Sequence, residues 1–172
     1  MNHQDIKRMT LAAILTAVAI TLHFVESMFT LPVAIPGIKL GLPNIVSLTA
    51  LYLFGPVEAF IILILRVFMT SFLYSGFSSL IFSLAGGILS IAGMSLIWKF
   101  RNRGFSIIST SVVGGVFHNI GQIFAAAVVM KTPSVFYYLP VLIVSGIATG
   151  IVTGIVSGSV IPRLSKIYHV DK

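Results

Sequence analysis

PGIKLGLPN, residues 36–44, separates two long apolar runs of a chain that is almost entirely apolar. The two prolines and two glycines of this stretch predict a break between helices. Lys39 and Asn44 add polar side chains where the flanking sequence is hydrophobic. In a membrane protein, irregular backbone with a fixed charge is tolerated where it faces water, protein or a ligand rather than lipid. We therefore expect this loop to contribute to a binding site.

Composition places the chain among integral membrane proteins. Of its 172 residues, 57% are hydrophobic and only 9% are charged, whereas a soluble domain carries about 25% charged residues. We expect one transmembrane domain over residues 1–172. The net charge of +7 comes from basic residues that flank apolar runs, so it indicates membrane topology rather than nucleic-acid binding. The chain lacks cysteine, which excludes disulfides and thiolate metal sites.

Six apolar segments predict an all-α bundle of transmembrane helices. They cover residues 9–29, 43–54, 56–73, 77–98, 106–130 and 134–161. A helix needs about 20 residues to cross the hydrocarbon core, so the second segment is short. It either borrows residues from the preceding loop or forms a re-entrant hairpin with the third segment.

The distribution of basic residues favours six crossings. With a cytoplasmic N-terminus, eight Lys and Arg residues lie inside, only Lys39 and Lys131 lie outside, and Arg66 lies within a span. This asymmetry follows the positive-inside rule, whereas a hairpin of the second and third segments would spoil it. We therefore expect a six-helix bundle with both termini in the cytoplasm.

Small residues recur at helical spacing in two segments. Glycines occupy every fourth position from 146 to 158, which keeps them near one face and lets another helix approach closely. This contact lies either inside the bundle or between subunits, and packing inside the bundle is favoured. Ala13 and Ala17 form a second small-xxx-small pair in the first segment.

Ionisable residues inside the apolar segments need partners because burying a charge in the membrane costs about 2.5–3.5 kcal/mol on translocon scales. Glu58 falls in the first turn of the third segment, where the helix N-terminus stabilises a carboxylate. Arg66 lies about 12 Å further along that helix and cannot pair with Glu58 directly. It serves either as a structural residue inside the bundle or as a contact to a ligand.

The fifth segment carries a polar cluster at mid-depth, formed by His118, Asn119 and Gln122. Such side chains either form hydrogen bonds between helices or contact a ligand. His23 and Glu26, near the outer end of the first segment, are further candidates. The predicted ligand contacts are Lys39, Asn44, Arg66, His118, Asn119 and Gln122. Together they predict an outward-facing pocket for a small molecule with an anionic or electron-rich part and an apolar part.

Motifs for catalysis are missing from the sequence. There is no P-loop, no His-Glu-x-x-His and no Cys/His cluster, and the four acidic residues are never adjacent. A prenyl-diphosphate synthase of the usual kind needs aspartate clusters to hold magnesium and diphosphate. We therefore expect no catalytic residues, no metal site and no cofactor, and we predict that the chain alone is not an enzyme.

Residues 36–44 and residues 117–122, Phe-His-Asn-Ile-Gly-Gln, resemble a bacterial family that carries two labels. One label is the Gx transporter family and the other is heptaprenyl diphosphate synthase component I. The family is similar to the substrate-binding S components of energy-coupling-factor (ECF) importers. This resemblance implies a bacterial plasma-membrane protein of six helices whose outward pocket is covered by the loop between helices one and two. It places Lys39 and Asn44 at that loop, and the polar cluster of the fifth segment at the ligand.

The resemblance also implies partners. S components dock on a transmembrane T component, which works with ATPases, through small residues of the first helix, a feature that Ala13 and Ala17 match. An S component of an ECF importer is therefore the first hypothesis. The second is a noncatalytic membrane subunit of a heptaprenyl diphosphate synthase in isoprenoid biosynthesis. The third is a carrier that works alone.

Overall fold

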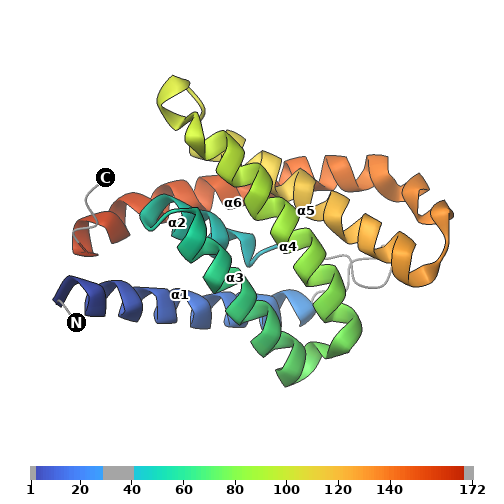
Figure 1. The fold of residues 1–172 in the computed structure, drawn as a ribbon. Coiled ribbons are helices and arrows are strands. Elements are labelled where there is room, and N and C mark those ends of the chain that lie inside the picture. The colour runs from blue at the N-terminus through green and yellow to red at the C-terminus, as the bar shows by residue number, and fades with distance from the viewer. Residues whose placement is uncertain (1–2, 29–40, 169–172) are drawn as a thin grey trace.

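The computed structural model describes residues 3–28 and 41–168, which are almost entirely helical (Figure 1). Its α-helices are α1 (His3–Met28), α2 (Asn44–Leu53), α3 (Pro56–Thr70), α4 (Gly76–Lys99), α5 (Ile107–Met130) and α6 (Leu139–Tyr168). Short π- or 3-10-helical turns, η1 (Ser71–Ser75), η2 (Arg101–Arg103) and η3 (Pro133–Tyr138), lie between some of them. The predicted loop contact Lys39 lies outside the described residues.

Five helices of the described residues are long and apolar enough to cross a membrane, which confirms the all-helical membrane class (Figure 1). The exception is α2, which has 10 residues. At about 1.5 Å per residue it spans about 15 Å, half of a hydrocarbon core of about 30 Å. Five of the six predicted spans therefore correspond to a helix of sufficient length, and the sixth crossing stays a prediction.

The short helix α2 lies at the centre of the bundle, where it contacts all five other α-helices. Most of its side chains are buried, namely Asn44, Val46, Ser47, Leu48, Thr49, Ala50, Leu51 and Leu53. A helix that is apolar on all faces is expected to be buried on every side. The central position of α2 therefore explains why apolar residues occur on all of its faces. Burial of α2 also fixes its polar first residue inside the bundle.

Glycines with positive φ separate the central helices. Gly55, with φ of 109°, lies in the short turn after α2, and α3 begins at Pro56. Gly76, with φ of 73°, follows η1 directly and is the first residue of α4. These backbone conformations favour glycine because a Cβ atom would be strained there, and proline at the first helical position needs no N–H partner. The sequence break predicted at residues 55–56 is therefore observed.

The glycine stripe of α6 faces α5. A Cβ atom placed on Gly146 would lie 2.9 Å from the carbonyl oxygen of Gly115, and one on Gly150 would lie 2.6 Å from the Cα atom of Val112. Gly154 is similarly close to α5, whereas a Cβ on Gly158 would meet open space. Close backbone approach explains the first three glycines. The stripe therefore packs inside the bundle, as the sequence favoured.

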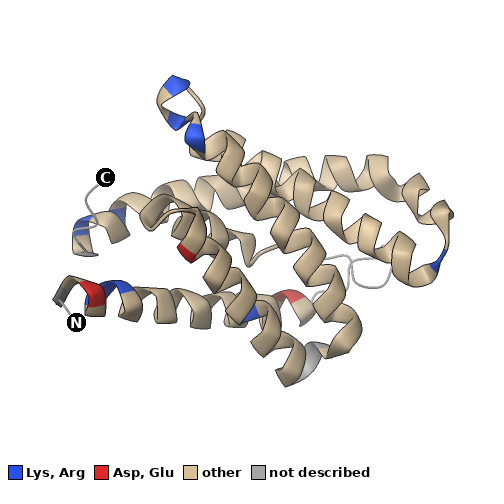
Figure 2. Ribbon diagram, viewed as in Figure 1, with Lys and Arg blue, Asp and Glu red and all other residues tan. Residues whose placement is uncertain are grey.

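Basic residues gather at selected helix ends. Figure 1 shows that both described ends of the chain lie at the same end of the bundle. Figure 2 shows Lys and Arg in the first turns of α1, in the last turns of α6 and at the turn between α4 and α5. The turn between α5 and α6 carries Lys131. This asymmetry agrees with a positive-inside arrangement, in which a cytoplasmic location of the termini stays a prediction.

Candidate ligand site

Polar side chains from five segments of the chain meet in a buried cavity inside the bundle. Its volume is about 10 Å³, which is room for about one water molecule. The residues that line it are His23, Glu26, Gly41, Pro43, Asn44, Arg66, Ser83 and His118. Their positions join the end of α1, the start of α2, and the middle of α3, α4 and α5. Five helices of the described chain therefore contribute to one small, largely polar site.

The carboxylate of Glu26 connects α1 to the start of α2. Its Oε1 atom accepts hydrogen bonds from the backbone N–H of Gly41 and, at 3.3 Å, from that of Leu42. The side chain of Glu26 is only 4% exposed. A buried carboxylate needs such donors because desolvation of an unpaired charge is costly. Gly41, with φ of 81°, has the left-handed backbone conformation that favours glycine.

Arg66 brings the opposite charge into the same cavity. It lies on the buried face of α3 with Ile62, Leu63 and Val67, and its spacing from these residues matches one side of a helix. Only 4% of its surface is exposed. Glu26 and Arg66 line one cavity, so their charges offset each other. The sequence suggested a cationic site. Within the described residues, the site instead contains both a positive and a negative side chain.

Among the buried polar atoms of the cavity, the Nε atom of Arg66, a donor, and the Oδ1 atom of Asn44, an acceptor, have no hydrogen-bond partner within the described residues. Buried polar groups are almost always satisfied in folded proteins. A water molecule or a polar ligand group that both accepts and donates would satisfy both atoms. This pair is the strongest local indication that the cavity binds something.

Gly86 makes room for the polar cluster of α5. A Cβ atom at this position would lie 2.9 Å from Cγ of Gln122 and 3.0 Å from Cε1 of His118. The absence of a side chain on α4 therefore lets both side chains fit between the two helices. This role is visible in the sequence only as a glycine inside an apolar segment.

The predicted site residues fall into distinct environments. Asn44, Arg66 and His118 are brought together in the cavity. Asn119 instead donates its amide to the carbonyl oxygen of Leu142, at 2.7 Å, and so joins α5 to α6. Gln122 is 2% exposed and packs against α4. Neither Asn119 nor Gln122 lines the cavity, so a ligand role for these two residues stays a prediction.

Ser83 belongs to the cavity but was not among the predicted contacts, and His23 and Glu26 were only weighed as additions. The signal for Glu26 was present in the sequence. An acidic residue near the end of an apolar helix needs a buried partner. Ser83 gave no such signal because a single serine is common in membrane helices.

The predicted docking residues Ala13 and Ala17 are both exposed on α1. This helix packs against α2 and α3, and these two alanines leave part of its surface flat. An exposed small-residue pair in a membrane helix permits close approach of another helix. Docking at this position stays a prediction.

A bundle with five membrane-length helices in its described part and a buried polar cavity defines a multi-pass membrane protein. The chain belongs to the heptaprenyl diphosphate synthase component I family, because the model of that family matches residues 15–160, more than half of the chain. The description as a component implies a partner subunit. No curated protein and no solved structure shows significant similarity to the chain.

Proposed function

We propose that the chain is the substrate-binding S component of an ECF-type importer. The observation that carries the proposal is the buried cavity in which Arg66 and Asn44 present unsatisfied polar atoms. A ligand group that accepts from the guanidinium and donates to the amide oxygen would complete the site. The sequence itself contains no P-loop, so active import requires separate ATPases.

The charge balance of the cavity refines the ligand class. A dianion would leave excess negative charge beside Glu26 in a poorly hydrated site, which is costly. The described residues therefore favour a neutral, zwitterionic or singly charged polar group over a dianion. Because the cavity of about 10 Å³ has room for about one water molecule, binding of a larger ligand with an apolar part requires the surrounding helices to move apart.

The partner surface in this proposal is the exposed face of α1 around Ala13 and Ala17. A T component would pack a helix against these small side chains. The test is co-expression of the tagged chain with candidate T components and ATPases from the same genome, followed by gentle co-purification. Ala13→Leu with Ala17→Leu should abolish recovery of the T component. Ala148→Leu, an equally small and exposed residue on α6, is the matched control and should retain it.

A second function is favoured by the family description. The chain would be a noncatalytic membrane subunit of a heptaprenyl diphosphate synthase. Its test is the chain length of the polyprenyl product made by the soluble catalytic partner with and without this protein. An altered product would favour this function, whereas recovery of a T component with ATPases would favour the importer. Uptake in proteoliposomes without ATPases would instead indicate a carrier that works alone.

A further inference from the structure

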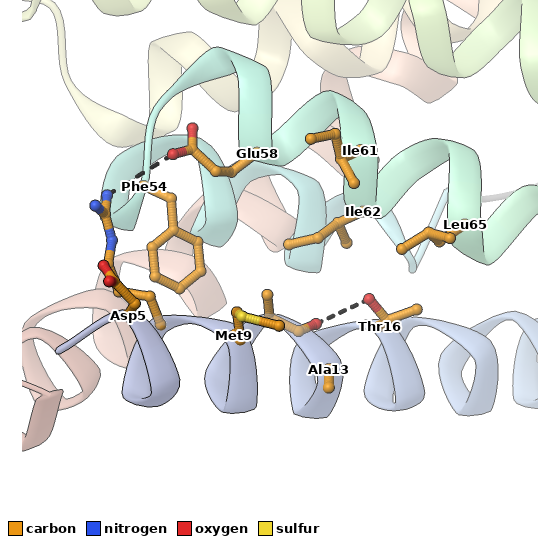
Figure 3. Close-up of a pocket in the computed structure, with 11 residues that line it drawn as sticks. Asp5, Met9, Ala13, Thr16, Phe54, Glu58, Ile61, Ile62 and Leu65 are labelled. Atoms are coloured by element: carbon orange, nitrogen blue, oxygen red, sulfur yellow. Dashed lines mark hydrogen bonds and ion pairs between the residues drawn. The ribbon is translucent and has the colours of Figure 1, made fainter. Parts of the chain in front are cut away.

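A groove of about 490 Å³ runs between α1 and α3, separate from the polar cavity (Figure 3). Figure 3 shows Met9 and Thr16 on the side of α1 that faces Ile61 and Leu65 of α3. The complete lining is Asp5, Arg8, Met9, Ala12, Ala13, Thr16, Phe54, Glu58, Ile61, Ile62 and Leu65. Both helices are long enough to cross the membrane, so the groove lies along the bilayer.

The body of the groove is apolar. Its one hydroxyl group, on Thr16, donates to the carbonyl oxygen of Ala12 at 2.8 Å, so it is satisfied within α1. From Arg8 to Thr16 the groove extends about 12 Å along the helix axis. One leaflet contributes about 15 Å of hydrocarbon. The apolar part thus matches the depth of a single leaflet.

The charged side chains lie at one end of the groove. The Nη2 atom of Arg8 is 3.7 Å from the Oε1 atom of Glu58, and the guanidinium carbon of Arg8 is 5.9 Å from the centre of the Phe54 ring. Asp5 lies at the same end (Figure 3). Among the described residues that line the groove, these two carboxylates and one guanidinium sum to one net negative charge. A zwitterionic group suits it, with an anion toward Arg8 and a cation toward the acids.

The volume of the groove decides between a lipid chain and a protein helix. An α-helix with side chains is about 10 Å across, so 12 Å of it occupies about 940 Å³. The groove holds about 490 Å³, so only one face of a helix could enter it, whereas a hydrocarbon chain can lie wholly within it. A partner helix would therefore cover the groove rather than fill it.

We propose that this groove binds one phospholipid with a zwitterionic, primary-ammonium head group. One acyl chain lies between α1 and α3, the phosphate approaches Arg8, and the ammonium approaches Glu58 and Asp5. The primary ammonium donates hydrogen bonds to the carboxylates, which a quaternary ammonium cannot do. The groove shares Ala13 with the docking face proposed above, so the lipid chain would lie beneath a docked T component, but its binding does not depend on transport.

Native mass spectrometry of the purified, reconstituted full chain tests the proposal. The protein is exchanged into bilayers with equal amounts of phosphatidylethanolamine, phosphatidylcholine and phosphatidylglycerol that carry identical chains. We expect one phosphatidylethanolamine to be retained. Ile61→Trp fills the groove and should lower its occupancy at least about fivefold. Phe60→Trp, on the same helix but outside the groove lining, is the control and should leave occupancy unchanged.

The head-group preference has its own test. Glu58→Gln removes one carboxylate from the charged end and should lower the preference for phosphatidylethanolamine over phosphatidylglycerol about fivefold. Glu58→Asp keeps the charge and should retain the preference. Absence of a retained lipid, equal retention of all three lipids, or equal occupancy in the two tryptophan variants would overturn the proposal. Far-UV circular dichroism of each variant verifies that the helices are intact.

Discussion

Glu26, near the end of α1, accepts a hydrogen bond from the backbone nitrogen of Leu42 at 3.3 Å, just before α2 begins. The same oxygen atom also accepts from the backbone of Gly41. One carboxylate thereby ties the first helix to the buried central helix. It also supplies the negative charge that offsets Arg66 in the cavity.

Replacing Glu26 by Gln should lower stability substantially. The amide retains an acceptor but loses the charge, and hydrogen bonds to charged groups contribute about 1.5–3 kcal/mol. The measurement is thermal unfolding in detergent, followed by circular dichroism. Glu58→Gln is the control, because its 3.7 Å ion pair with Arg8 is about half exposed and such pairs contribute about 0–1 kcal/mol. Equal losses in both variants would contradict the role of Glu26.

Arg66→Met should destabilise the protein by about 3–5 kcal/mol, because it leaves the buried carboxylate of Glu26 without its opposite charge. The double variant Arg66→Met with Glu26→Gln should recover part of this loss. A double-mutant cycle of unfolding free energies measures the coupling between the two residues. Strictly additive losses would show that the two charges do not interact.

Ligand retention should also depend on Arg66. Arg66→Ala, and Lys39→Ala as the sequence predicts, should reduce the amount of small molecule that co-purifies with the protein. Arg101→Ala should not, because Arg101 stacks on Trp98 at an exposed turn. Mass spectrometry of the denatured extract quantifies the released molecule. The same ligand content in all three variants would disprove the assignment of the pocket.

Gly86→Ala should be destabilising by about 1–3 kcal/mol, because the added methyl group collides with Gln122 and His118. Gly158→Ala is the matched change on α6, where a Cβ meets open space. It should be neutral or stabilising by up to about 1 kcal/mol. Thermal unfolding of the two variants separates them, and a tolerated Gly86→Ala would show that α4 and α5 are packed less closely.

Asn119→Leu tests whether this residue acts between helices or at the ligand. Its bond to Leu142 is 2.7 Å long, and hydrogen bonds between membrane helices contribute about 0.6 kcal/mol on average. We expect a small loss of stability with unchanged ligand content. A stable variant that has lost the ligand would instead support the role that the sequence suggested.

Much of the fold follows from periodicity and charge. A close contact of the last helix was visible as glycines at every fourth position, although its partner, α5, was not, and the break at Gly55 and Pro56 was visible as a glycine–proline pair. The central position of α2 was not, because burial on all sides and a membrane span give the same uniform apolar sequence.

The site was only partly predictable. Arg66 and His118 stood out because polar groups inside apolar helices need partners. The partner of each polar side chain did not follow from its spacing along the sequence, because it depends on how helices far apart in sequence meet. Glu26 offsets Arg66 across the bundle, and Asn119 bonds to α6 rather than lining the cavity.

A native mass spectrum of the gently extracted protein shows ligand and partners together and is therefore the sharpest test of the proposed importer role. We expect a complex of this chain with one T component and two ATPases, and a small polar molecule bound to the chain. The molecule should be lost in Arg66→Ala while the complex persists. A chain that is recovered without these partners and without a small molecule would contradict the proposed role as an S component.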